Sequence, residues 1–130
     1  MGITQEQAVR DFLLEWECES LDDSRIERLL NRMTPDIRWH VNAWDRPLVG
    51  QNAVREELQR LAPHYRDYRS EILAIASVHQ TVFTQRLDSM VVGGKPLTQH
   101  IAGAYEVDTE SKISVLRDYF DRKEVDAQLA

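Results

Sequence analysis

The half of the chain that follows Tyr65 restricts the fold most, because it reads as one β-strand after another. Two successive glycines, Gly93 and Gly94, are a strong signal for a tight hairpin turn, since glycine accepts the positive φ angles that such turns need. A further turn is predicted between Asp108 and Lys112. We therefore predict a four-strand antiparallel meander, with strands near residues 68–79, 81–92, 96–107 and 113–120.

The half of the chain before Tyr65 is mostly helical. Apolar residues that recur every three to four positions predict three helices, over Thr4–Glu17, from about Asp23 to Met33 and over Gly50–Leu61. Between the last two, residues 37–42 alternate apolar and polar side chains, which is typical of a half-buried strand. The N-terminal half therefore supplies the helices that can cover a sheet.

Together the two halves predict an α+β fold, in which helices pack on one side of a curved, largely antiparallel sheet. The segment Thr34-Pro35-Asp36 is predicted to end the second helix, and a short charged helix is predicted to close the chain from about Arg122. A sheet bent over helices tends to leave a conical cavity between the two layers. We therefore expect an internal pocket.

The length of 130 residues, with 42% hydrophobic and 29% charged residues, predicts one domain spanning residues 1–130. The formal net charge of −6 argues against binding to nucleic acid or to an anionic membrane, because both need a positive field. No apolar run approaches the ~20 residues of a membrane span. The N-terminal residues lack the pattern of a signal peptide, and the single cysteine, Cys18, excludes an internal disulfide. A cytoplasmic location is therefore expected.

Motifs for common cofactors and metals are missing from the sequence. It contains no glycine-rich nucleotide loop and no nucleophile elbow of the GxSxG type. The histidines are His40, His64, His79 and His100. No two of them have the spacing of a zinc site, so we expect neither a cofactor nor a metal.

Three charged residues fall on strand positions that point toward the predicted core. Arg86 and Asp88 share one face of their strand because alternate residues point the same way, and Asp118 shares a face with apolar side chains. Their apolar neighbours on these faces are Val82, Met90, Leu116 and Phe120. A buried carboxylate needs a partner, and the Arg86 guanidinium offers five donors and a permanent charge. The cluster is either a structural ion-pair network or a catalytic site with one ionised and one protonated carboxyl.

The segments around these residues resemble the limonene-1,2-epoxide hydrolase family. Those enzymes carry Arg-x-Asp on one strand and Arg-Asp-Tyr-Phe-Asp on the last strand. The corresponding segments here are Arg86-Leu87-Asp88 and Arg117-Asp118-Tyr119-Phe120-Asp121, and Gly50-Gln51-Asn52-Ala53-Val54 is similar to the family's helix entry. The resemblance spans most of the chain. It implies the cone-shaped α+β fold of the nuclear transport factor 2 (NTF2)-like or SnoaL-like superfamily.

The resemblance also implies roles for single residues. Asp118 matches the general base that activates a water, Asp88 the general acid that protonates the epoxide oxygen, and Arg86 the arginine that bridges both. Asn42 matches an asparagine that helps to hold the water, and His40 stands where the family has a tyrosine. The candidates for the substrate pocket, which could equally belong to an ordinary core, are Ile101, Phe120, Met90 and Leu116.

The expected activity is hydrolysis of a small apolar epoxide by water, in one step and without a cofactor, to give a vicinal diol. A homodimer is expected from the family resemblance. One alternative is an isomerase or polyketide cyclase on the same fold, which would need only one of the two aspartates as acid or base. Another is a non-enzymatic binding or dimerisation module, in which Arg86, Asp88 and Asp118 would face solvent or be replaceable by apolar residues.

Overall fold

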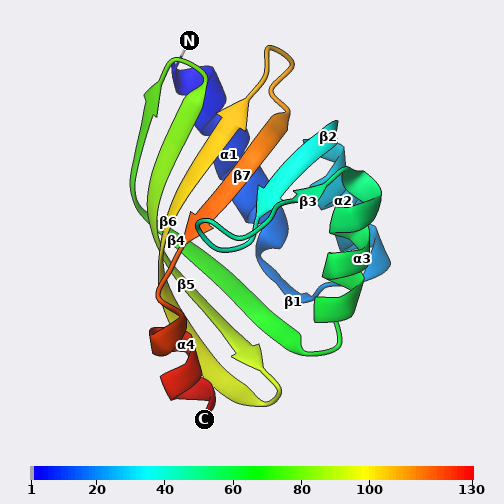
Figure 1. Cartoon of the computed structure of the whole chain (residues 1–130), viewed down its shortest axis with the longest axis vertical. Coiled ribbons are helices and arrows are strands. Elements are labelled where there is room, and N and C mark those ends of the chain that lie inside the picture. Colours follow the sequence, from blue (N-terminus) through cyan, green and yellow to red (C-terminus); the bar gives the residue numbers. More distant parts are fainter. Residues whose placement is uncertain (1) are drawn as a thin grey trace.

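The computed structural model describes residues 2–130 and contains a seven-stranded sheet that curves around helices (Figure 1). The strands are β1 (Cys18–Ser20), β2 (Met33–His40), β3 (Leu48–Val49), β4 (Tyr65–Val78), β5 (Thr81–Val92), β6 (Lys95–Val107) and β7 (Ile113–Tyr119). Their order across the sheet is β1-β4-β5-β6-β7-β2-β3. All neighbours are antiparallel except β2 and β7, which are parallel. The sheet is therefore mixed, and β4 to β7 form the predicted meander.

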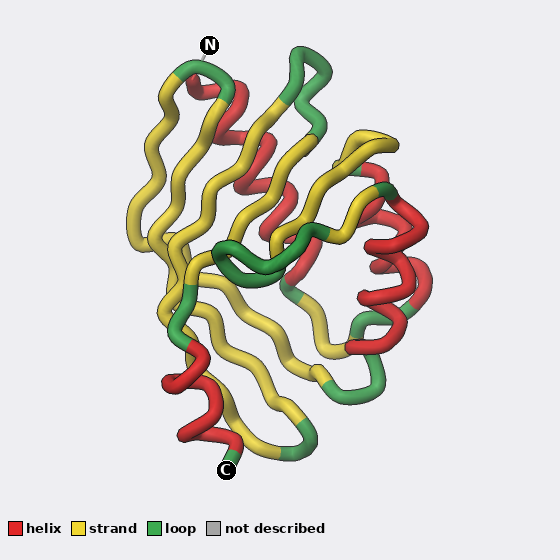
Figure 2. Tube along the Cα trace, in the orientation of Figure 1, coloured by secondary structure: helices red, strands yellow, loops and turns green. Residues whose placement is uncertain are grey.

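The helices lie on one face and at the two ends of this sheet. They are α1 (Gly2–Trp16), α2 (Asp23–Asn31), α3 (Gln51–Leu61) and α4 (Arg122–Leu129). Figure 1 shows α1 crossing behind the sheet, with α2 and α3 together beside β2 and β3. Figure 2 shows the same grouping, with the C-terminal helix apart from the other three. The predicted α+β architecture with N-terminal helices on a curved sheet is confirmed.

The main core joins the three N-terminal helices to the inner face of the sheet. Phe12 of α1, Leu29 of α2 and Leu58 of α3 are 1% exposed or less, as are Ile37 of β2 and Ile113 of β7. Burying a side chain of this size stabilises a fold by about 1.5–3 kcal/mol. This core packs α1, α2 and α3 against β2 and β7. It fixes β2 and β7 next to each other, and with them one side of the pocket described below.

Two irregularities bend the long strand β4. Its register with β5 shifts between Arg66 and Arg69 and again between Ile72 and Ala74. Asp67, inside the first shift, has a φ of 54°, a left-handed conformation that Asp tolerates better than most residues. Because bulges bend a strand and increase its twist, they let β4 and β5 wrap around α1.

The sequence placed the start of β2 too late. The second helix ends at Asn31, and Thr34-Pro35-Asp36 belongs to the strand that begins at Met33. Met33 pairs with Ile113 of the parallel strand β7. The Gln51 side-chain amide donates to the carbonyl oxygens of Leu30 and Met33, at 3.0 and 3.1 Å. These long-range contacts outweigh the local helix signal. The strands β1 and β3 were not predicted, because with three and two residues they are too short to show a periodic pattern.

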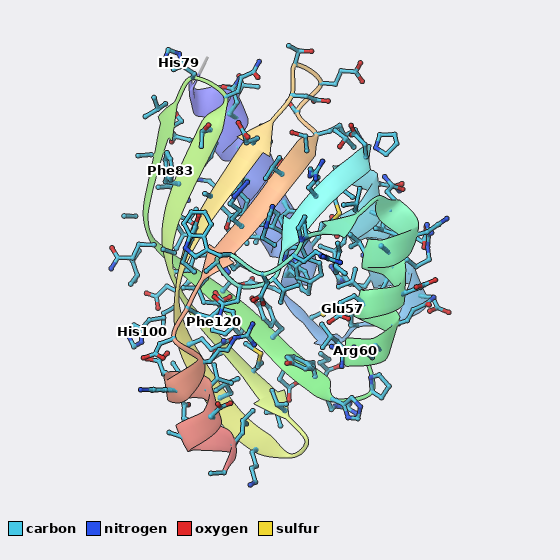
Figure 3. The ribbon with its side chains drawn as sticks, in the orientation of Figure 1. Glu57, Arg60, His79, Phe83, His100 and Phe120 are labelled. Atoms are coloured by element: carbon cyan, nitrogen blue, oxygen red, sulfur yellow. The ribbon has the colours of Figure 1, made fainter. Side chains whose placement is uncertain are left out.

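Helix α4 covers an edge that β7 leaves open. β7 pairs only with the second half of β6, from Ala102 onward. In the first half of β6, the Gln128 side chain bonds both the N–H and the carbonyl oxygen of Thr98, and Glu124 accepts from the N–H of His100. Figure 3 shows His100 beside this helix. The side chains of α4 thus satisfy strand groups that a neighbouring strand would otherwise bond.

Candidate active site

The strand register brings Arg86, Asp88 and Asp118 to one place. On β5, Arg86 and Asp88 both lie on the inner, buried face. On β7, Asp118 lies opposite Gly103 of β6, and Gly103 in turn lies opposite Thr84 of β5. The three charged side chains therefore meet under the middle of the sheet, as their strand parity predicts.

Arg86 bridges the two carboxylates. Its Nε and Nη2 atoms donate to Oδ1 and Oδ2 of Asp88, at 3.3 and 3.0 Å, which is the two-bond geometry that suits a guanidinium. Its Nη1 atom donates to Oδ1 of Asp118 at 3.2 Å. The side chains of Arg86 and Asp88 are 3% and 0% exposed, whereas that of Asp118 is 16% exposed. Only Asp118 of the two carboxylates is thus open to a bound molecule.

Hydroxyl groups complete the network around the ion pairs. The Tyr68 hydroxyl donates to Oδ2 of Asp88, and the Ser70 hydroxyl donates to Oδ1 of Asp88 at 2.8 Å. Arg86 also donates from Nη1 to the Tyr105 hydroxyl, which lies 3.0 Å from the hydroxyl of Thr84. Arg86 and Asp88, the two fully buried charges, are therefore each hydrogen-bonded on several sides, as a charge in such a dry place requires, whereas the Asp118 carboxylate accepts one bond, from Arg86.

Burial controls the protonation of this cluster. Burial raises the pKa of Asp118, and the Arg86 charge offsets part of that rise. Burial also raises the pKa of Tyr68 well above its ordinary value, and the nearby Asp88 charge raises it further. Tyr105 has its pKa raised by burial to about 12. For Arg86, burial alone would lower the pKa, but the charge of Asp118 and its other partners raises it. Both phenols thus stay protonated and the guanidinium stays charged.

A pocket of about 930 Å³, including its open mouth, lies between α1 and the sheet and ends at this cluster. Arg86 and Asp118 line it, whereas the buried Asp88 does not. All four residues predicted as pocket candidates line it, namely Ile101, Phe120, Met90 and Leu116. Further apolar walls come from Phe12, Leu13, Trp16, Leu21, Trp39 and Leu61. The pocket is therefore mostly apolar, and its charged wall residues are Arg86 and Asp118 at the cluster and Arg66 of β4.

His40 and Asn42 do not line this pocket, contrary to the expected water-binding positions. Strand β2 instead turns Trp39 and the following Val41 toward it. The His40 ring Nδ1 lies 3.1 Å from the carbonyl oxygen of Asp45, and Oδ1 of Asn42 accepts from the backbone N–H of Phe120 at 3.3 Å. Both side chains therefore contact backbone groups of neighbouring segments. Because Trp39 and Val41 face the pocket, strand alternation places His40 on the opposite face.

The sequence interpretation missed the residues that support the cluster. Tyr68 and Ser70 are two positions apart on β4, and Ser70 lies directly opposite Asp88. Their polar alternation was visible in the sequence, but the pairing register that sets them against Asp88 was not. Gln99, which lies opposite Asp88 on β6 and lines the pocket, was missed for the same reason.

Within residues 2–130, no three His, Cys, Asp or Glu side chains gather in a way that could hold a metal ion. None of the helices in this part of the chain is long and apolar enough to cross a membrane.

The fold and the pocket define a small α+β protein of the NTF2-like class. Two solved structures share this fold with a TM-score of 0.80 each. One is a limonene-epoxide-hydrolase-like epoxide hydrolase from M. tuberculosis, 21% identical, with 98% of this chain and 91% of that chain covered. The other is described as a SnoaL-like polyketide cyclase from Shewanella putrefaciens CN-32, 13% identical, with 96% and 95% covered.

Sequence comparison is more specific than the fold. The model of the limonene-1,2-epoxide hydrolase catalytic domain matches residues 4–130. The chain therefore belongs to the limonene-1,2-epoxide hydrolase family, which confirms the resemblance seen in its two charged segments. No curated protein sequence matches it.

Proposed function

We propose that this protein is an epoxide hydrolase that adds water to a small apolar epoxide in one step and releases a vicinal diol. The observation that carries this proposal is the single guanidinium of Arg86 that joins two carboxylates at the pocket, one open and one buried. The family to which the chain belongs supports the same chemistry. The walls of the pocket suit an apolar substrate.

Opening an epoxide with water requires a base and an acid at the same time. Asp118, as the base, takes a proton from water while the water oxygen bonds to an epoxide carbon. The carbon–oxygen bond of the epoxide breaks, and its oxygen receives a proton that originates from Asp88. Each such positioned proton transfer contributes about 10²–10⁴-fold to the rate. Neither a covalent ester nor a metal is needed for this route.

The exposure of the two carboxyl groups supports this division of roles. The base must touch the attacking water, and the Asp118 side chain lines the pocket. The acid need not touch that water, and the side chain of Asp88 is fully buried. We propose that Asp118 itself holds the water. Asn42 then acts indirectly, through its bond to the N–H of the pocket residue Phe120.

A screen of terpene-like, cycloalkene and styrene-type epoxides for diol product tests this proposal. Asp118→Asn removes the base and Asp88→Asn removes the acid, while both keep the shape of the side chain. We expect diol from the wild-type protein and a loss of turnover of at least about 10²-fold in each variant. Turnover near that of the wild type in either variant would refute the assignment of roles.

The two alternatives make different demands on the same residues. An isomerase or cyclase would need one acid–base group, so only one of the two asparagine variants would lose activity toward its substrate. A non-enzymatic module would not need the buried charges. The network argues against a non-enzymatic module, because a buried ion-pair network often stabilises a fold no better than apolar packing would.

We also propose that the protein forms a homodimer through the outer face of the sheet, away from α1. Phe83, labelled in Figure 3, is 47% exposed there, beside the small side chains of Ala76 and Ala104 on the adjacent strands. Exposed apolar groups on a sheet often mark an interface. Phe83→Asp should give a monomer in sedimentation analysis. Leu14→Asp, at a leucine of α1 that is 60% exposed, should leave the dimer intact. A cytoplasmic location remains a prediction from the single free cysteine.

A further inference from the structure

The carboxyl group that must supply the proton is separated from the pocket by its own partners. Asp88 is 0% exposed and is absent from the pocket wall. Its two oxygens receive four hydrogen bonds, from Tyr68, from Ser70 and twice from Arg86. A substrate in the pocket therefore cannot take a proton from Asp88 directly. One of the partners must carry it.

Only one of the three partners has both the chemistry and the position to do so. A guanidinium has no acceptor and does not lose a proton in proteins, so Arg86 cannot pass one on. A hydroxyl can accept a proton on its oxygen while it releases another, which leaves Tyr68 and Ser70. Tyr68 lines the pocket, whereas Ser70 does not.

We propose, on the basis of the epoxide hydrolysis proposed above, that Tyr68 is the catalytic group that protonates the epoxide oxygen, and that Asp88 re-protonates Tyr68 in the same step. The O–H bond of Tyr68 breaks as a new O–H bond forms on the epoxide oxygen, which keeps the electron pair of the broken carbon–oxygen bond. In this reacting state Asp88 is protonated and the Tyr68–Asp88 hydrogen bond is reversed, so that Asp88 donates and its proton moves to the oxygen of Tyr68. The attacking water loses its proton to Asp118.

This step conserves charge, and both carboxyl groups can afterwards return to their starting protonation states. Asp88 begins protonated and ends ionised, and Asp118 does the reverse. Asp118 then releases its proton to water in the pocket. Asp88 regains a proton from pocket water through the Tyr68 hydroxyl. Of the partners of Asp88 that can carry a proton, Tyr68 is the one that borders the pocket.

The surroundings of Tyr68 suit a fixed proton carrier. Its ring packs against that of Trp16, with centroids 5.6 Å apart and planes inclined at 43°. It follows the β4 bulge at Asp67, and bulges often aim a side chain beside an active site. Burial holds the pKa of Tyr68 high, so the phenol keeps the proton that it must donate. Tyr68 shares the pocket wall with Arg86 and Asp118, beside the other half of the reaction.

The test compares Tyr68→Phe with Ser70→Ala, which are a matched pair. Each variant removes one hydroxyl from Asp88, but only Tyr68 is also a residue of the pocket wall. We expect kcat to fall by about 10²–10⁴-fold in Tyr68→Phe and by less than about 10-fold in Ser70→Ala. Equal losses in the two variants would mean that the hydroxyls only position Asp88, and would overturn the proposal.

Two further measurements separate proton transfer from positioning. In mixtures of H₂O and D₂O, the wild-type rate should depend on more than one moving proton, and a linear dependence would contradict the relay. Fluorinated tyrosine at position 68 keeps the shape but makes the phenol more acidic, so kcat should change with its acidity; an unchanged kcat would also contradict the relay.

The outcomes separate this inference from the function on which it rests. If the wild-type protein forms no diol from any epoxide of the screen, the proposed hydrolase activity fails, and the relay fails with it. If the wild-type protein forms diol and folded Tyr68→Phe does so at a similar rate, the relay alone is refuted. Circular dichroism of each variant identifies a loss of folding.

Discussion

Replacing Arg86 by lysine tests whether one planar guanidinium is needed to join the two carboxylates. Arg86 makes three hydrogen bonds to them, two with Asp88 and one with Asp118. An ammonium group keeps the positive charge but is a compact point charge on a flexible stem. Lysine can satisfy one carboxylate or the other, but it cannot reproduce this geometry on both.

The expected losses follow from the number of bonds. Lysine keeps at most one of the three, and a hydrogen bond to a charged group contributes about 1.5–3 kcal/mol. Water in the pocket re-solvates part of Asp118, so we expect Arg86→Lys to lower the free energy of unfolding by about 2–4 kcal/mol. Turnover should fall by at least about 10²-fold, because the acid and the base are no longer aligned with each other.

Urea unfolding and diol formation measure the two losses, with Arg60→Lys as the control. Arg60 pairs with Glu57 on α3, where both are labelled in Figure 3, and its side chain is 67% exposed. Replacing an exposed arginine of this kind should change the free energy of unfolding by less than about 1 kcal/mol. If Arg86→Lys is as stable and as active as Arg60→Lys, the bridging role of Arg86 is refuted.

Three further predictions concern the pH dependence, the support of Arg86 and the polarity of the pocket. Because Asp118 must be ionised and burial raises its pKa, kcat/KM should fall as the pH is lowered, with a midpoint above the ordinary aspartate pKa of about 3.9. His40→Ala should leave that profile unchanged, since His40 lies outside the pocket wall. Gly103→Ala would place a methyl group 2.5 Å from the Tyr105 hydroxyl, so calorimetry should show a loss of about 1–3 kcal/mol, together with lower turnover. Gln99→Leu should lower KM for hydrocarbon epoxides and raise it for epoxides with a hydrogen-bonding substituent, and comparison of two such substrates checks this.

Much of the fold could be predicted because long strands and amphipathic helices carry strong periodic signals. Strands β4 to β7 and helices α1 to α3 lie close to their predicted ranges. The start of β2 could not be predicted, because Pro35 is a reliable local signal for the end of a helix, but pairing with β7 decides where the strand begins. Such long-range pairing leaves no mark in the local sequence.

The charged trio could be predicted for the same reason, and the water-holding pair could not. The parity of Arg86, Asp88 and Asp118 depends on long, regular strands, in which every second residue faces inward. His40 and Asn42 instead straddle the end of β2, where the chain leaves the strand and Ala43 adopts a φ of 49°. Trp39 and Val41 face the pocket, so alternation turns His40 away from it, and the water-holding role of the pair was implied only by the family resemblance.

Asp88 and Asp118 carry the same chemical group but differ in environment, because different residues lie opposite them in the sheet. Opposite Asp88 lies Ser70, whose hydroxyl bonds it, and Tyr68 closes the pocket side, so Asp88 is dry. Opposite Asp118 lies Gly103, which has no side chain to cover it, and Asp118 remains partly open to the pocket. A carboxyl in contact with pocket water can accept a proton from it. The pairing of strands thus sets the difference in environment that acid and base catalysis by the same residue type requires.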